Sequence, residues 1–133
     1  MNFVAEKGST TTIRTQPEVV RNLKATVTPH KNLEGGQLVT VDWSGYTPGA
    51  AISILECNPS NRDLANSPGC DYTKAALLHD NPTGEGSLQL EIIEGQVGDG
   101  ICDAEHKGCF ILINNESSSD PKDAVFVTIT FAK

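Results

Sequence analysis

Hydrophobic and polar residues alternate along much of the chain. Within residues 23–28, apolar side chains alternate with Lys and Thr, and the same period of two returns at 39–44, 87–92 and 125–131. A period of two places successive side chains on opposite faces of a β-strand. Each of these segments therefore predicts a strand with one buried face.

Three further segments predict strands on other grounds. Ile52 and Ile54 begin a strand that ends at Cys57, and residues 72–79 can form another. Residues 110–113 are apolar throughout, which is typical of a strand buried on both faces. Clusters of Gly, Pro and Asn separate the segments. Seven short strands without a convincing helix predict an all-β chain, and their spacing favours an immunoglobulin-like β-sandwich.

The buried faces of these strands should form the core. That core should be mainly aliphatic, because 38% of the residues are hydrophobic but only 5% are aromatic. The parity of Trp43 with its apolar neighbours favours a place in the core over a place in a binding cleft. A chain of 133 residues is long enough for one such core. The residues expected mainly in the core are Val39, Val41, Ile52, Ile54, Leu88, Leu90, Ile111, Ile113, Val127 and Ile129.

Residues 1–21 do not share this pattern. They contain the polar run GSTTT at residues 8–12, followed by Pro17. We expect an N-terminal arm or linker over residues 1–21, followed by a single sandwich domain over 22–133. Residues 1–7 lack the basic start and apolar stretch of a secretory signal, and no apolar run has the length of a membrane span.

The four cysteines form two local pairs, Cys57 with Cys70 and Cys102 with Cys109. Neither pair has zinc-knuckle spacing, so we predict two disulfides that each close a short loop; four free thiols are the alternative. Disulfides imply an oxidising compartment. We therefore expect a secreted protein whose natural signal lies upstream of this chain, or one domain of a longer exported protein.

Charge and motifs exclude several functions. The chain has 17 acidic and 10 basic residues, a formal charge of -7, which argues against direct binding to nucleic acid. Nucleophile-elbow, phosphate-loop and dinucleotide motifs are missing, and the histidines His30, His79 and His106 are dispersed. We expect no enzymatic activity and no cofactor.

Three carboxylates, Asp99, Asp103 and Glu105, lie close together in the sequence near the second cysteine pair. Hard cations such as calcium bind clusters of oxygen ligands, but this spacing is not that of an EF-hand loop. We interpret the segment as a solvated acidic turn, with His106 as a solvated loop residue, and expect no metal site.

Several segments together resemble the neocarzinostatin family, small actinobacterial apoproteins that carry enediyne antibiotic chromophores. The resemblance covers about residues 23–131 and implies a seven-stranded immunoglobulin-like sandwich with two short disulfide-closed ribbons. A cleft between ribbons and sandwich would hold the chromophore. The matching segments are ATVTP at 25–29, LEGGQ at 33–37, WSGYTPG at 43–49, ECNP at 56–59, GEGSLQL at 84–90, the segment from Cys102 to Ile111, and AVFVTITF at 124–131.

Four positions depart from the pattern of the chromophore carriers. Carriers have an aromatic residue two positions after the first cysteine, where this chain has Pro59, and another in the loop that here spans residues 94–100 without an aromatic ring. Phe110 stands where a polar residue is common, and Asn114 where a serine often lines the cleft floor. The resemblance therefore implies a retained scaffold with altered ligand contacts.

The leading hypothesis is a non-enzymatic exported protein that holds an apolar small molecule in this cleft. The alternative is an immunoglobulin-like interaction or spacer module of a longer secreted or cell-surface protein. We expect a monomer that does not bind membranes. Phe110 suits the cleft wall and the core equally well. The expected ligand-binding residues are Pro59, Leu64, Tyr72, Ile101, Phe110 and Asn114.

Overall fold

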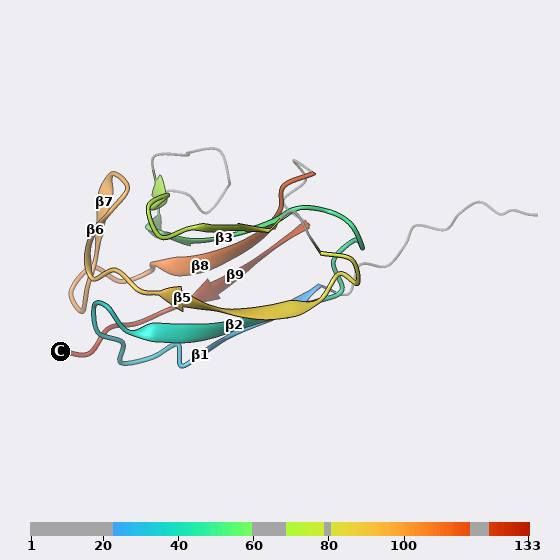
Figure 1. The fold of residues 1–133 in the computed structure, drawn as a ribbon. Helices are drawn as coiled ribbons and strands as arrows, with labels where there is room; N and C mark the ends of the chain where they lie inside the picture. The colour runs from blue at the N-terminus through green and yellow to red at the C-terminus, as the bar shows by residue number, and fades with distance from the viewer. Residues whose placement is uncertain (1–22, 60–68, 79–80, 118–122) are drawn as a thin grey trace, which may run out of the picture.

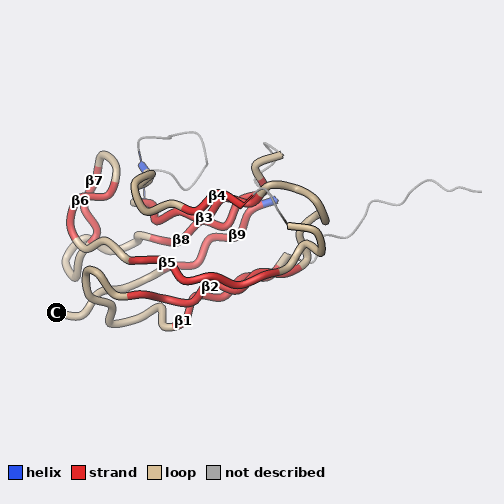
Figure 2. Tube along the Cα trace, in the orientation of Figure 1, coloured by secondary structure: helices blue, strands red, loops and turns tan. Residues whose placement is uncertain are grey.

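The computed structural model describes residues 23–59, 69–78, 81–117 and 123–133. These residues form an all-β sandwich of two antiparallel sheets, with a short two-stranded ribbon at one end (Figure 1). Regular structure in the described part of the chain is almost entirely strand (Figure 2). No helix among these residues is long and apolar enough to cross a membrane.

One layer is a three-stranded sheet in the order β1-β2-β5. It consists of β1 (Lys24–Thr28), β2 (Leu38–Ser44) and β5 (Gly86–Glu91), paired antiparallel. In β2, Val39, Val41 and Trp43 are buried while the residues between them are half-buried or exposed. The alternation predicted for this segment is therefore present, with its apolar face toward the other sheet.

The facing layer is a four-stranded sheet in the order β4-β3-β8-β9. It consists of β4 (Ala76–Leu78), β3 (Ile52–Cys57), β8 (Phe110–Asn115) and β9 (Ala124–Thr128). Each of the seven predicted segments thus contains one strand of the sandwich. Within the described part of the segment predicted over 72–79, residues 72–78, the strand is the short edge strand β4.

The segment that leads into the second cysteine pair forms a small ribbon, as the family resemblance implies. β6 (Gly95–Val97) pairs with β7 (Gly100–Cys102). Gly98 has a φ of 61°, which the two-residue turn between these strands requires and glycine adopts without steric cost. The loop closed by the first disulfide falls largely at residues 60–68, outside the described residues, so a second ribbon there stays a prediction.

The core lies between the inner faces of the two sheets. Eight of the ten residues expected there are buried, Trp43 joins them, and the hydroxyl of Tyr46 crosses the sandwich to donate to the carbonyl oxygen of Ile113 at 2.7 Å. Leu88 and Val127 are only half-buried. They lie on β5 and β9, which are edge strands, so one flank of each side chain lacks a neighbouring strand.

A second apolar cluster covers the outer face of the four-stranded sheet. It contains Leu55, Phe110, Leu112 and the disulfide of Cys57 with Cys70. Because strands β3 and β8 have the core on one face and this cluster on the other, both are buried along nearly their whole length. The burial on both faces predicted for residues 110–113 is confirmed.

Candidate functional site

A cleft of about 500 Å³ lies on the outer face of the four-stranded sheet. Its floor is formed by β3 and β8, and one wall is formed by the segment that leads from the first disulfide into β4. The volume lies within the range of small-molecule sites. The floor residues are Ser53, Leu55, Leu112 and Asn114; the wall residues are Cys70, Tyr72, Ala75, Ala76 and Leu77; Glu116 stands at the end.

The floor of the cleft consists of two cross-strand pairs. Leu55 on β3 lies opposite Leu112 on β8, and Ser53 lies opposite Asn114 in the same ladder. Side chains two residues apart on a strand share a face, so both pairs point to the same side of the sheet. The cleft floor therefore has an apolar part and, one step along the strands, a polar part.

The wall of the cleft is attached to the sheet by the first disulfide. Cys70 is bonded to Cys57 at the end of β3, and the backbone N–H of Asp71 donates to the carbonyl oxygen of Glu56 at 2.9 Å. Tyr72 and Leu77 follow on this wall with 60% and 55% of their surfaces exposed. These two exposed apolar side chains border a concave surface, which is typical of a site for another molecule.

The polar part of the cleft is organised around one carboxylate. Oε2 of Glu116 accepts a hydrogen bond from the hydroxyl of Ser53 and a second, of 3.1 Å, from the amide nitrogen of Asn114. The backbone N–H of Glu116 donates to the carbonyl oxygen of Ala51 at 2.9 Å. Backbone and side chain of Glu116 are thus both held beside the cleft.

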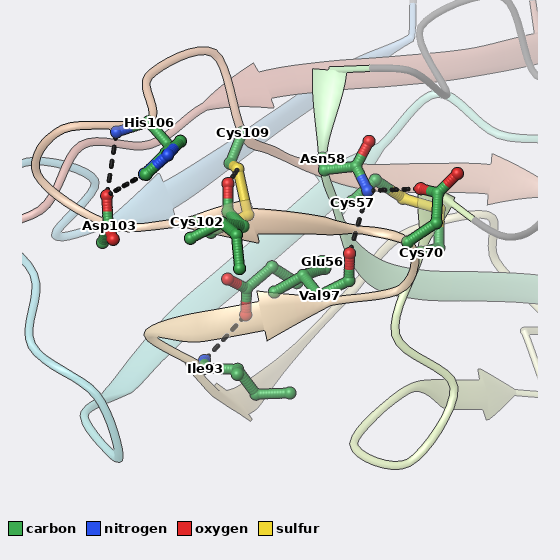
Figure 3. The surroundings of a disulfide bond; sticks show 12 residues. Glu56, Cys57, Asn58, Cys70, Ile93, Val97, Cys102, Asp103, His106 and Cys109 are labelled. Atoms are coloured by element: carbon green, nitrogen blue, oxygen red, sulfur yellow. Dashed lines mark hydrogen bonds and ion pairs between the residues drawn. A yellow bond between two sulfur atoms is a disulfide. The ribbon is translucent and has the colours of Figure 1, made fainter.

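A buried carboxyl lies on the opposite face of β3, close to the first disulfide (Figure 3). Oε1 of Glu56 accepts a hydrogen bond of 2.8 Å from the backbone N–H of Ile93, while Oε2 is buried without a hydrogen-bond partner among the described residues. Burial raises the pKa of Glu56 to about 7. The hydrogen bond from Ile93 lowers this pKa, and the nearby charge of Asp71 raises it.

Asn58 connects the first disulfide to the ribbon. Its amide nitrogen donates to the carbonyl oxygen of Val97 and to a carboxylate oxygen of Asp99, both at 2.9 Å (Figure 3). A Cβ atom at Gly100 would lie 2.7 Å from this nitrogen, so the contact requires glycine on β7. The ribbon is therefore held against the end of the four-stranded sheet.

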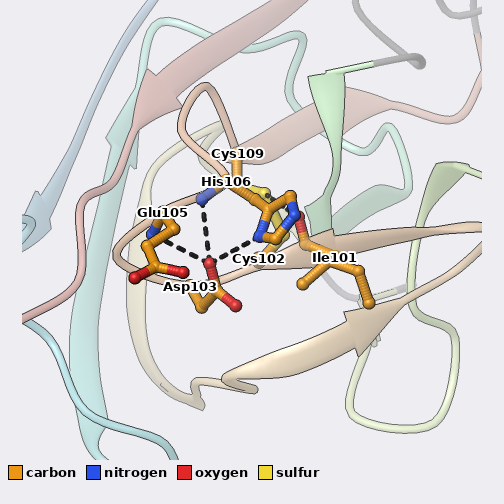
Figure 4. Close-up of polar contacts among 6 residues, drawn as sticks. All are labelled: Ile101, Cys102, Asp103, Glu105, His106 and Cys109. Atoms are coloured by element: carbon orange, nitrogen blue, oxygen red, sulfur yellow. Dashed lines mark hydrogen bonds and ion pairs between the residues drawn. A yellow bond between two sulfur atoms is a disulfide. The ribbon is translucent and has the colours of Figure 1, made fainter.

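The second disulfide, Cys102 with Cys109, closes a loop that a single carboxylate organises (Figure 4). Oδ1 of Asp103 accepts from the backbone N–H groups of Glu105 and His106, and lies 2.8 Å from Nδ1 of the His106 ring. The hydrogen bond from this ring is the main cause that keeps the pKa of Asp103 below its usual value.

The three carboxylates predicted to form a solvated acidic turn have separate roles. Asp99 accepts from Asn58, Asp103 accepts from the loop of the second disulfide, and Glu105 is exposed. Among the described residues, no group of three or more His, Cys, Asp or Glu side chains has the arrangement of a metal site.

Two of the six predicted ligand-binding residues, Tyr72 and Asn114, line the cleft. Phe110 is fully buried in the second apolar cluster, where its ring lies 5.2 Å from that of Phe126. Of the two places that the sequence allowed for Phe110, the structure shows an interior one. Ligand contact by any of the six residues stays a prediction.

Two more of the predicted residues, Pro59 and Ile101, lie outside the cleft. Pro59 is exposed and faces the second disulfide loop, since a Cβ atom added at Gly108 would be 2.9 Å from its Cγ. Ile101 is 40% exposed on β7 and is not among the residues that line the cleft. Leu64 lies outside the described residues.

Sequence reasoning missed the other eight residues that line the cleft, including Ser53, Leu55 and Leu112 on the floor and Glu116 at the end. A signal was present for Leu112, because the apolar run 110–113 indicated burial on both faces and so a second apolar surface. The pairing of Leu112 with Leu55 comes from the β3–β8 register, which a single strand's pattern does not contain.

Comparisons with known proteins agree with this architecture. The model of the neocarzinostatin family matches residues 25–131. The solved structure of macromomycin is similar with a TM-score of 0.62 and 26% sequence identity, over 83% of this chain and 99% of that chain. A structure of apokedarcidin, with a TM-score of 0.58 and 20% identity over 82% and 97% of the two chains, shows the same fold. No curated protein matches the sequence.

Proposed function

Since the chain belongs to the neocarzinostatin family, we propose that it is a non-enzymatic binding protein that holds an apolar small molecule in the cleft on the outer face of its four-stranded sheet. The observation that carries this proposal is the floor of that cleft. Leu55 and Leu112 lie side by side beneath a concavity of about 500 Å³, bordered by the exposed side chains of Tyr72 and Leu77.

Removal of apolar surface from water would supply most of the affinity. Each Å² of buried apolar surface contributes about 25 cal/mol. Tyr72 is the aromatic side chain among the described cleft residues, and one stacked ring adds about 0.5–1.5 kcal/mol beyond its area. The rigid strands of the floor limit the entropy lost on binding, because they are ordered before the ligand arrives.

The ligand that we propose differs from an enediyne chromophore of the kind the family resemblance implies. Pro59 replaces the first aromatic residue of the carriers, and residues 94–100 contribute no ring. Two missing stacked rings would weaken binding by about one to two orders of magnitude. The expected result of titrating the protein with a stable enediyne-chromophore analogue is therefore weak binding, and nanomolar affinity would contradict it.

We propose further that the protein acts outside the reducing cytosol. Its two disulfides, Cys57 with Cys70 and Cys102 with Cys109, persist in oxidising compartments. The first of them also attaches the wall of the cleft to the end of β3. Ligand binding would therefore depend on a covalent link that is stable only in an oxidising compartment.

A matched pair of substitutions tests the location of the site. Leu77 in the cleft wall and Leu38 on the opposite sheet are 55% and 54% exposed, so a change to arginine should be tolerated equally by the fold. Calorimetric or fluorescence titration with a neutral polycyclic aromatic probe should give saturable binding to the wild type. We expect Leu77→Arg to weaken it about tenfold and Leu38→Arg to leave it unchanged. Equal effects, or no saturable binding, would contradict the proposal.

A further inference from the structure

The chemistry of the cleft indicates which apolar molecules it prefers. We propose that the cleft selects ligands that carry a protonated amine beside an apolar body, and that Glu116 is the residue that recognises the amine. This inference rests on the proposed function, because it assigns a ligand class to the same cleft. It concerns the polar part of the floor rather than the apolar part.

Glu116 is the one charged side chain among the described residues that line the cleft. On the neighbouring wall, Nζ of Lys74 lies 3.2 Å from Oε1 of Glu91, so that cation is directed toward the opposite sheet. Among the described residues, no Lys, Arg or His nitrogen lies within salt-bridge distance of Glu116. The cleft therefore presents a net negative charge next to its apolar floor.

The carboxylate of Glu116 is positioned by its neighbours. Ser53 and Asn114 both donate to Oε2. An ionised carboxylate accepts about four hydrogen bonds over its two oxygens, so Oε1 keeps its capacity to accept one from a ligand. The strongest partner for such an oxygen is a cationic N–H donor, because charge assistance roughly doubles the strength of a hydrogen bond.

The orientation of Asn114 supports this role. Because a carboxylate only accepts hydrogen bonds, the amide of Asn114 must turn its nitrogen toward Glu116. Oδ1 of Asn114 is thereby left buried without a hydrogen-bond partner among the described residues. An unsatisfied buried acceptor is unfavourable and uncommon, and such exceptions call for an explanation. Here the reason is that Asn114 and Ser53 act as positioning residues for the carboxylate.

The register of β3 with β8 sets the distance expected between the amine and the apolar body of the ligand. The Ser53–Asn114 pair lies two residues along the strands from the Leu55–Leu112 pair. Two residues of a β-strand span about 7 Å. A ligand that uses both parts would place its amine about 7 Å from the centre of its apolar body, with the amine toward Glu116.

Two probes of nearly equal shape separate charge recognition from apolar binding. We would titrate the full chain by calorimetry with 2-(2-naphthyl)ethylammonium and with the uncharged 2-(2-naphthyl)ethanol. Wild-type protein should bind the ammonium probe about five- to tenfold more tightly, and the ratio should fall as salt screens the carboxylate. Glu116→Gln keeps one acceptor oxygen, replaces the other oxygen by an NH2 donor and loses the charge, so the ratio should fall to about one.

Glu85→Gln is the control. Glu85 is an exposed carboxylate directly before β5 of the three-stranded sheet, and it does not line this cleft. It should keep the wild-type ratio. If both probes bind the wild type equally, or if Glu116→Gln keeps the preference, the amine inference is overturned while the apolar cleft survives. If neither probe binds, the proposed function fails, and the amine inference fails with it.

Discussion

The indole of Trp43 lies across from Gly86 in the β2–β5 ladder, and a Cβ atom at position 86 would come within 2.5 Å of its Cζ2 atom. The ring occupies the space that a side chain would need. Its Nε1 donates to Oδ1 of Asn81 at 3.4 Å, so the ring is also held from its polar edge. Glycine at position 86 is thus a packing requirement of the core.

We therefore expect Gly86→Ala to destabilise the protein by about 1–3 kcal/mol, because the added methyl group forces the indole out of its position. Urea denaturation followed by Trp43 fluorescence would measure the change. Ser87→Ala, at the neighbouring exposed position, should stay within about 0.5 kcal/mol of the wild type. Equal stability of the two variants would show that the indole can move without cost.

Truncation of Leu90 tests the core itself. Leu90 is 3% exposed at the inner face of β5, so Leu90→Ala should cost about 2–5 kcal/mol through lost burial and an unfilled cavity. Leu38→Ala removes the same atoms from a side chain that is 54% exposed and should cost far less. Chemical denaturation of both variants would give the comparison, and a cost below about 0.5 kcal/mol at Leu90 would contradict the placement of β5.

The hydroxyl of Tyr46 links the two sheets, since it donates to the carbonyl oxygen of Ile113 on β8. Burial keeps the pKa of Tyr46 well above its usual value, so the hydroxyl remains a donor in mildly alkaline solution. Tyr46→Phe should cost about 1–3 kcal/mol because a buried carbonyl loses a partner.

The exposed Tyr72 provides the matched control for this prediction, and Tyr72→Phe should leave stability within about 0.5 kcal/mol. Spectrophotometric titration adds a second measurement. Tyr46 should titrate only well above the usual pKa of a tyrosine, and Tyr46→Phe should remove this late transition. Titration of Tyr46 in the usual range would mean that its hydroxyl is not buried.

The buried carboxyl of Glu56 makes stability depend on pH. Its pKa of about 7 in the folded state lies above the value of 4.5 expected for the exposed side chain. The folded state therefore binds more protons than the unfolded state between about pH 4.5 and 7. Through Glu56, the free energy of unfolding is greatest below pH 4.5 and falls as the pH rises through 7.

For one group this difference amounts to at most about 3 kcal/mol at pH 8. Glu56→Gln, which cannot ionise, should be more stable than the wild type at pH 8 by about 1–3 kcal/mol, and the gain should shrink toward pH 5. Differences in urea midpoint across this range measure the effect, with Glu85→Gln as the exposed control. A gain that is independent of pH would argue against a buried, titrating carboxyl.

The sequence by itself determined the strands and the cysteine pairs, because both depend on neighbours along the chain. The period of two around Val39 and Val41 specifies which face of β2 is buried, and local spacing brings Cys102 beside Cys109. The apolar run that begins at Phe110 also indicated a strand covered on both faces. These features need no knowledge of the opposite sheet.

Only the tertiary structure decided which distant residues meet on the faces of β3. The register of β3 with β8 brings Ser53 to Asn114 and, across 63 residues of sequence, to Glu116. The parity of Glu56 with Ile52 and Ile54 was readable in the sequence, and alternation alone places it on the inner face. Its burial depends on the segment at Ile93 that covers it. Contacts of this kind arise from packing between distant segments, whereas strand patterns arise from the geometry of one chain segment.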